Sequence, residues 1–423
     1  MPVHTKYLSC LLNRSRQVVC LVDTLTAIAL YSYGFTHYHT RKWFHAFPPR
    51  PLLALFSRAS EDTETNIPYW YRPHRSRTKL PILFIHGIGI GLFPYVPFFH
   101  ELAAQDPDVG ILAIEILPIC MHITTPPLAR DAMCAAITRI LDAHGLRRIV
   151  VTGHSYGTVV AAHLLRRQWD SVSTLSPHRH TQQPDHEPLV MTTEDGNRVT
   201  DEDDGGQGGI IIAAALLIDP IPFLLHHPAV AYNFVYRQPR RANEWQLWYF
   251  ASRDADIARA LSRHFFWFES ILFREDVLPA LDVAGIGPNA SNEGNRRRLP
   301  VAVSLAGRDQ IVDANAVRAY LTGGEGEEGA DAPAAAAEGM DVDVDVPSRH
   351  HLWKREELEV LYFPELDHAT VFDARQDRAA LLEVLSRFVR RDEDEAKAET
   401  EATDAASGTT LASPKVNDLV DLE

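Results

Sequence analysis

The feature that most constrains the 423-residue sequence is an abrupt change within residues 149–165, IVVTGHSYGTVVAAHLL. An apolar run typical of a buried parallel strand stops at Ser155, and an apolar helical stretch begins directly after it. A chain that passes from strand to helix within so few residues must bend sharply at the serine. Gly153 and Gly157 flank the bend, and we expect both to be required because a side chain at either position would collide with the strand or helix that crosses there.

This bend has a chemical consequence. It places the Ser155 hydroxyl above the carboxyl edge of the sheet, where ligands bind in open α/β folds. The first N–H groups of the following helix then lie near the hydroxyl and can stabilise negative charge. The five residues match the G-x-S-x-G pattern of a nucleophile elbow, and the strand and helix around them make a chance match improbable. We expect His154 to be a packed or supporting side chain, because it leaves the turn on the side opposite Ser155.

A serine hydroxyl is a poor nucleophile unless a base accepts its proton and an acid orients that base. The candidates lie at the ends of later strands in the same predicted sheet. His368 follows the apolar run LEVLYF closely, and Asp309 ends the run VAVSLAGRD. Asp219, which ends the run ALLIDP, is an alternative acid. The chain order Ser155, Asp309, His368 is the order that this kind of sheet produces.

A tetrahedral intermediate also needs donors for its oxyanion. The segment FIHGIGIGLFPY supplies a turn after a strand, and its glycines allow close backbone approach to a substrate. We expect the N–H groups of Ile88 and Tyr156 to be the donors, with Gly89 as the alternate, and His86 to fix the loop by hydrogen bonding. A phosphate-binding loop is disfavoured because the glycine-rich turn lacks the lysine and the spacing of such loops.

Apolar strand-like runs alternate with helical stretches, which predicts a parallel sheet covered on both faces. The runs NIPYWYRP and LPILFIHG predict a hairpin or two neighbouring strands. Three segments, 168–209, 322–350 and 391–423, are polar and acidic in composition, and we expect them to be disordered. The predicted organisation is an N-terminal helical extension (1–60), a core (61–220 and 299–390), an insertion (168–209), an aromatic-rich helical segment (221–298), an acidic loop (322–350) and an acidic tail (391–423).

The motifs HGIGIG, GHSYG, GRDQIV and LDHA together resemble those of the α/β-hydrolase superfamily. The resemblance implies an α/β fold with an eight-stranded, mostly parallel sheet flanked by helices, and a Ser–His–Asp triad. It also implies a helical cap inserted between strands 6 and 7, and residues 221–298 occupy that place in the chain. The insertion at 168–209 and the N-terminal extension depart from the usual family pattern.

These residues predict a lipase-like or esterase-like serine hydrolase that cleaves carboxylic esters through an acyl-enzyme intermediate. The alternatives are an acyltransferase or thioesterase that uses the same triad, and a non-catalytic hydrolase-like binding protein. We expect neither a cofactor nor a metal ion. The aromatic residues of the cap indicate a pocket for an apolar acyl ester, and the candidates are Trp245, Trp248, Phe265, Phe266 and Trp267.

The formal net charge of −15 says little about partners, because it is concentrated in the predicted disordered segments. The insertion, the acidic loop and the tail carry −7 each, so the rest of the chain carries +6. We expect no nucleic-acid partner. The four cysteines lie in apolar surroundings without a paired motif, which favours a reducing, intracellular compartment.

The N-terminal segment is basic and apolar. Residues 1–58 contain seven Lys or Arg and one Asp. The apolar run VVCLVDTLTAIALYSYGF is too short to span a bilayer and contains a charge. Its residues Val18, Leu21, Leu25 and Ile28 fall on one helical face. This pattern predicts a helix that packs on the protein's own core, or one that lies on a membrane surface through residues 11–35; a signal anchor is the third interpretation. The protein is then cytoplasmic or peripherally membrane-associated; the sequence does not predict its oligomeric state.

Overall fold

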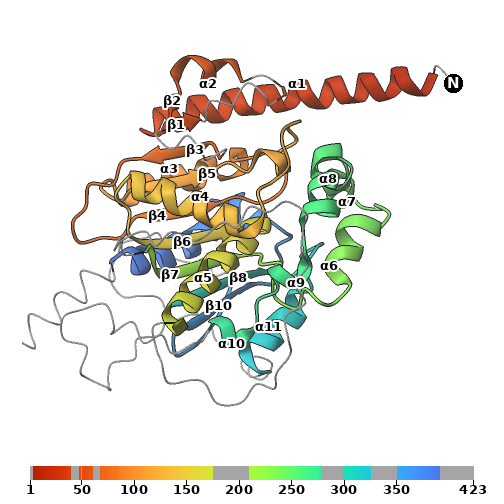
Figure 1. Ribbon diagram of the computed structural model, residues 1–423. Coiled ribbons are helices and arrows are strands. Elements are labelled where there is room, and N and C mark those ends of the chain that lie inside the picture. The colour runs from red at the N-terminus through yellow and green to blue at the C-terminus, as the bar shows by residue number, and fades with distance from the viewer. Residues whose placement is uncertain are drawn as a thin grey trace, which may run out of the picture.

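The computed structural model describes residues 3–39, 47–48, 50–60, 67–174, 209–277, 299–324 and 350–390 (Figure 1). Most of the predicted insertion and acidic loop, the last part of the predicted cap and the whole acidic tail lie outside the described residues.

The described residues form one ten-stranded sheet in the order β2-β1-β3-β5-β4-β6-β7-β8-β10-β9. Neighbouring strands are parallel from β5 to β10, whereas β3 is antiparallel to both β1 and β5, and β9 is antiparallel to β10. The mostly parallel sheet predicted from the sequence is therefore present. The strands are β1 (Thr36–His39), β2 (Arg58–Ala59), β3 (Tyr69–Arg72), β4 (Ile82–Ile85), β5 (Ile111–Ile114), β6 (Arg148–His154), β7 (Ile211–Ile218), β8 (Val301–Ala306), β9 (His351–Arg355) and β10 (Leu358–Phe363).

The helices lie on both faces of this sheet. Successive residues of a strand point to opposite faces, so β4 sends Leu83 into one core and Phe84 into the other. The first core includes side chains of α4 (Arg130–Ala143), α5 (Tyr156–Thr174) and α11 (Ala314–Thr322). The second includes side chains of α1 (Val3–Ser32), α3 (Val96–Gln105) and a helix over residues 375–390. Burial on both faces explains why the central strands are continuous apolar runs.

Two details of the predicted sheet were wrong. The sheet has ten strands where the resemblance implied eight, because the short strands β2 and β9 extend its two edges. The runs around β3 and β4 are not neighbours either, since β5 pairs with both and lies between them. Without the edge strands β2 and β9, the strands β7 and β8 are the sixth and seventh in chain order.

Short helices follow β7 along the chain as far as residue 277, where this described range ends. A further correction concerns the predicted insertion, whose first residues, 168–174, continue helix α5. The helices after β7 are α6 (Ala229–Ala231), the π-helical turn η4 (Tyr232–Tyr236), α7 (Ala242–Leu247), the π-helical turn η5 (Trp248–Ser252), α8 (Ala255–His264), α9 (Trp267–Ser270) and α10 (Arg274–Val277).

The N-terminal extension is helical in α1 and α2 (Pro51–Phe56), but it also contributes β1 and β2 to the sheet. A buried charge network fastens it to the core. Both terminal nitrogens of Arg50 donate to the carboxylate of Glu115, at 2.7 and 2.6 Å, and His37 Nε2 lies 3.1 Å from the same carboxylate. Arg50 Nε also pairs with Asp23 of α1 at 3.2 Å. Burial would raise the pKa of Glu115, but Arg50 and His37 hold that pKa well below its ordinary value.

Within the described ranges, no helix is long and apolar enough to cross a membrane.

Replacing Arg50 tests this network. We expect Arg50→Ala to lower the free energy of unfolding by about 3–5 kcal/mol at neutral pH, because it leaves the buried Glu115 charge unpaired. The loss should shrink at acidic pH, since a carboxylate with a depressed folded-state pKa stabilises the fold only while it stays ionised. Urea unfolding measures both effects. Arg58→Ala, at an exposed position of the same extension, is the control, and an equal effect of the two variants would contradict the role of Arg50.

Candidate active site

Ser155 lies at the sharp bend between β6 and α5, as the pattern predicts. Its φ angle is +50°, in the left-handed region that a serine rarely adopts. A Cβ on Gly153 would come within 2.7 Å of the carbonyl oxygen of Gly157, and a Cβ on Gly157 would overlap the carbonyl oxygen of Ile85. The two glycines are therefore required by backbone packing, and the bend that they permit fixes the position of the serine.

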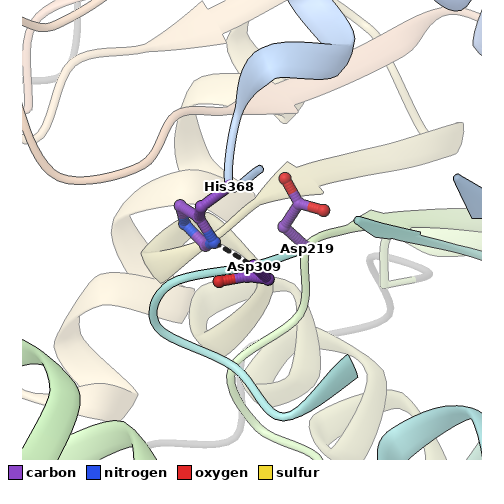
Figure 2. A group of neighbouring side chains, drawn as sticks. All are labelled: Asp219, Asp309 and His368. Atoms are coloured by element: carbon purple, nitrogen blue, oxygen red, sulfur yellow. Dashed lines mark hydrogen bonds and ion pairs between the residues drawn. The ribbon is translucent and has the colours of Figure 1, made fainter. Parts of the chain in front are cut away.

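Three side chains from remote parts of the sequence meet at this bend. His368 Nε2 lies 2.8 Å from Ser155 Oγ, and His368 Nδ1 lies 2.7 Å from Asp309 Oδ2. Because a carboxylate only accepts, Nδ1–H donates to Asp309, which leaves Nε2 of a neutral imidazole free to accept the serine proton. The loops after β8 and β10 carry Asp309 and His368, so both groups reach Ser155 from the carboxyl edge of the sheet. Figure 2 shows the hydrogen bond between His368 and Asp309.

Asp309 is itself held in place by backbone groups. Its Oδ1 accepts hydrogen bonds from the N–H groups of Ile311 and Val312, at 2.7 and 2.9 Å. These bonds occupy one carboxylate oxygen and direct the other toward His368. The local sequence Asp309-Gln310-Ile311-Val312 thus forms a turn that orients the acid.

The alternative acid, Asp219, lies beside the same histidine but has different partners (Figure 2). Its carboxylate accepts the N–H of Ala306 at 3.2 Å and the N–H of Ala369 at 2.7 Å. Asp219 directly follows β7, Ala306 is the last residue of β8, and Ala369 follows the histidine, so this carboxylate joins two strand ends to the loop that carries His368. In the structure, Asp309 accepts the hydrogen bond from His368, whereas Asp219 holds the loop of His368 in position.

Three carboxylates act on His368. Burial alone would lower the pKa of this histidine, but the hydrogen-bonded charge of Asp309, with further contributions from Asp219 and Asp367, raises it to about 9. The neighbouring carboxylates therefore favour the imidazolium form, which is the form that a base reaches after it accepts a proton.

Asp219, Asp309 and His368 could also be considered as a set of metal ligands, since one ligand atom from each lies within 4.8 Å of the others. However, both ring nitrogens of His368 already have hydrogen-bond partners, and Asp219 accepts two backbone N–H groups. The arrangement suits proton transfer between Ser155 and His368 better than it suits ion binding.

The loop after β4 approaches Ser155 from the other side. His86 fixes it as predicted: its Nδ1–H donates to the Gly87 carbonyl at 2.7 Å, and its Nε2 accepts the N–H of Ile116 at 2.9 Å. The N–H of Gly89, the alternate oxyanion donor, is engaged with the Ile119 carbonyl at 3.0 Å. This hydrogen bond disfavours Gly89 as a donor to a substrate.

His154 and Tyr95 hold the same loop in place through hydrogen bonds. His154 is buried, and its Nδ1 lies 2.7 Å from the hydroxyl of Tyr95, which also accepts the N–H of Gly87 at 3.0 Å. Burial lowers the pKa of His154 and so favours the neutral ring, whose Nδ1 accepts a hydrogen bond from the Tyr95 hydroxyl. Tyr95 was missed in the sequence analysis, because nothing near it in the sequence indicates a contact with residue 154.

An apolar cavity of about 340 Å³ opens above Ser155. Of the five aromatic residues predicted for the pocket, Phe265 and Trp267 line this cavity, and Phe266 lines a smaller cavity nearby. Trp245 and Trp248 line neither of the two cavities, and Trp245 is exposed. The aliphatic lining was not predicted, and it includes Ile88, Ile221, Leu225, Val230, Leu261 and Ile311.

Comparisons with known proteins are limited in extent. No family model matches the sequence. A 94-residue stretch, 22% of this chain, is 33% identical to Lipase LipV of Mycobacterium tuberculosis; it spans 34% of that protein, so the chain covers about a third of the length of this curated relative.

Solved structures are similar along more of the chain but at low identity. A bacterial membrane phospholipase A is 13% identical over 92% of this chain and all of its own, with a TM-score of 0.45. Naproxen esterase of Bacillus subtilis is 11% identical over 76% of this chain and 87% of its own, with a TM-score of 0.41. Carboxylesterase CesB of the same organism is 10% identical over 88% and 98%, with a TM-score of 0.44.

The chain's own geometry carries the assignment of the fold. The mostly parallel sheet, the left-handed serine between β6 and α5, and the hydrogen-bonded series Ser155–His368–Asp309 occur together at one edge of the sheet. The chain therefore has the architecture of the α/β-hydrolase fold.

Proposed function

We propose that the protein is a serine hydrolase that cleaves carboxylic esters through an acyl-enzyme intermediate. The observation that carries the proposal is the hydrogen-bonded series of Ser155, His368 and Asp309, whose serine lines an apolar cavity. The bend at the strand end alone would explain the strained conformation of the serine. The hydrogen bonds that also link this serine to a base and an acid support a role as a nucleophile. Esters with an apolar acyl group fit the lining of the cavity.

In the proposed mechanism, Ser155 Oγ attacks the acyl carbon while His368 Nε2 takes its proton. Asp309 keeps the ring in the required tautomer and stabilises the imidazolium. The N–H groups of Ile88 and Tyr156 would bind the oxyanion: Tyr156 is the first residue of α5, so its N–H has no partner within the helix, and Ile88 lines the cavity. His368 then returns the proton to the leaving alcohol, and a water molecule, activated in the same way, releases the acid.

The proposed division of the chain follows from this site. The sheet and its flanking helices form the catalytic core, and the helices between β7 and β8 act as a cap, because residues from Ile221 to Trp267 form most of the cavity lining. The first 60 residues are an extension of the core.

Replacing the serine tests the proposal directly. We expect Ser155→Ala to abolish hydrolysis of an activated medium-chain ester and covalent labelling by a fluorophosphonate probe, because both need the hydroxyl. Gel labelling and absorbance assays measure these losses. A wild-type protein that is not labelled, or a variant that is labelled equally, would favour the non-catalytic binding protein. Adding an alcohol acceptor to the assay separates hydrolysis from acyl transfer by the ratio of ester to acid formed.

The carboxylates around His368 predict an unusual pH dependence. A general base must be neutral, so kcat/KM should rise with pH through the pKa of His368, at about 9, instead of near the ordinary value of 6.5. We expect Asp219→Asn to move this rise to lower pH, because it removes a charge that favours the imidazolium. The measurement is kcat/KM against pH. Asp313→Asn, at the exposed N-cap of α11, is the matched control, and an unmoved profile in Asp219→Asn would refute the effect.

The cavity volume predicts an acyl-length preference. A cavity of about 150 Å³ holds a benzene-sized group, so about 340 Å³ holds roughly twelve carbon atoms. We expect kcat/KM to rise with acyl length to roughly ten to twelve carbons and then to fall. Val230→Phe narrows the cavity and should shorten the optimum, whereas turnover of the acetyl ester, as internal control, stays the same. A wild-type optimum at the acetyl ester would contradict this assignment of the cavity.

A further inference from the structure

Helix α1 has the reverse of the usual pattern of a surface helix. Its side chains are described from residue 17 to residue 32, and in that stretch the exposed positions are Gln17, Val18, Leu21, Leu25, Ile28 and Ser32. Four of these six are large aliphatic residues and none is charged, although a helix that faces only water normally exposes polar and charged residues. Leu21 and Ile28 are 59% and 56% exposed. The described part of the body does not cover this face, so the predicted packing of these four residues on the core is wrong.

The opposite face of α1 explains why the helix is nevertheless well placed. Ala27 and Leu30 are buried in one of the two main cores, and Thr26 is also buried. Asp23 also faces inward, where it pairs with Arg50 at 3.2 Å and with His122 Nε2 at 2.9 Å. The helix is thus held to the body along one side by apolar contacts and an ion pair, and it presents the aliphatic row on the other.

Helix α2 extends the aliphatic row. Leu55 and Phe56 are 75% and 62% exposed, the largest exposures among the described large apolar side chains apart from that of Tyr236. The rings of Phe56 and Tyr31 contact each other edge to face, with centroids 6.2 Å apart, which joins α2 to the end of α1. We call Val18, Leu21, Leu25, Ile28, Leu55 and Phe56 the docking face.

The charge of this region indicates what the docking face meets. Residues 1–58 contain seven basic residues and a single acidic residue, Asp23. That aspartate pairs with Arg50 in the interior, so the other six basic residues of the segment have no acidic residue within it to balance them. Arg58 is exposed directly beyond α2, and the sequence before the row adds Lys6, Arg14 and Arg16. An apolar helical face in a basic segment is complementary to an anionic lipid surface, whereas a second copy of the same basic segment would be repelled.

We propose that the docking face of α1 and α2 binds the surface of an anionic phospholipid bilayer. The helix lies in the plane of the interface and does not span it, since Asp23 and the buried face keep it bound to the protein. The proposal goes beyond the proposed function and does not depend on it, because binding needs no catalytic residue.

The position of α1 gives this binding a consequence for the cavity. Val19, on the inner side of the helix, packs with Met121 and with Ile257 of α8. Three residues that pack against this cluster, namely Ile88, Phe234 and Leu261, also line the cavity above Ser155. Figure 1 shows α1 continuing past the sheet toward the side where α8 lies. A bilayer on the docking face is therefore separated from the cavity wall by little more than one helix, about 10 Å, which suits apolar esters dissolved in lipid.

Vesicle sedimentation of the full chain tests the proposal. The probes are vesicles of phosphatidylcholine alone and of phosphatidylcholine mixed with phosphatidylglycerol, and the protein carries Ser155→Ala so that no lipid is consumed. We expect binding to the mixed vesicles, weaker binding to the neutral ones, and loss of binding as salt increases. Leu21→Gln combined with Leu25→Gln and Ile28→Gln should lower the partition coefficient by roughly tenfold or more. Arg58→Ala should lower it by roughly fivefold.

The matched control is Leu352→Gln, an exposed leucine of β9 at the opposite edge of the sheet. It should bind vesicles as wild type does, and thermal unfolding should show that the docking-face variants remain folded. Equal binding by the triple variant and Leu352→Gln, or no binding of the parent protein to mixed vesicles, would overturn the proposal. So would a dimer that the triple variant dissociates without any vesicle binding, since the face would then join two copies. None of these outcomes depends on whether the protein hydrolyses esters.

Discussion

The whole site depends on one close approach between two stretches of backbone. At Gly157 the first turn of α5 lies against the carbonyl oxygen of Ile85, at the end of β4, with no room for a Cβ. This contact fixes β4, β6 and α5 relative to one another and leaves Ser155 in a left-handed conformation. The position of the hydroxyl follows from backbone geometry, and side chains such as Tyr95 and His154 only have to support it. Strain of this kind persists because the surrounding packing over-determines it.

The sequence predicted the strands and helices better than their arrangement. A buried strand has a local sequence pattern, so the central strands could be located from the sequence. Which strands pair with each other depends on the path of the connections between them, and this path places β5 between β3 and β4. The edge strand β9 was missed because its residues, HLWKR, are mostly polar and half-exposed. Helix α5 extends into the predicted insertion, although residues 168–174 have low helix propensity. The side chain of Gln168 forms hydrogen bonds with the backbone of Ile212 on β7, and these bonds stabilise the extension.

The site shows the same division between local and long-range information. Ser155, Asp309 and His368 could be proposed because each follows an apolar strand, and parallel strands bring such positions to one edge. The lining of the cavity could not be deduced in this way. Aromatic residues mark a pocket only when their helices turn toward it, and Trp245 faces solvent whereas aliphatic Leu261 lines the cavity.

The two acids near His368 need different explanations. A charge that stabilises the imidazolium before a substrate binds also favours the protonated form of the proposed base, and a pKa raised to about 9 makes that form predominant at pH 7. Only stabilisation that grows during the reaction lowers the barrier. The hydrogen bond from His368 to Asp309 strengthens as the ring gains charge, so Asp309 can contribute in this way. Asp219 adds a more distant charge, which stabilises the imidazolium equally before and during the reaction. Its contribution is instead structural, through the hydrogen bonds that it accepts from two backbone N–H groups. By binding the ends of β7, β8 and the loop of His368 together, it keeps the ring within 2.8 Å of the serine.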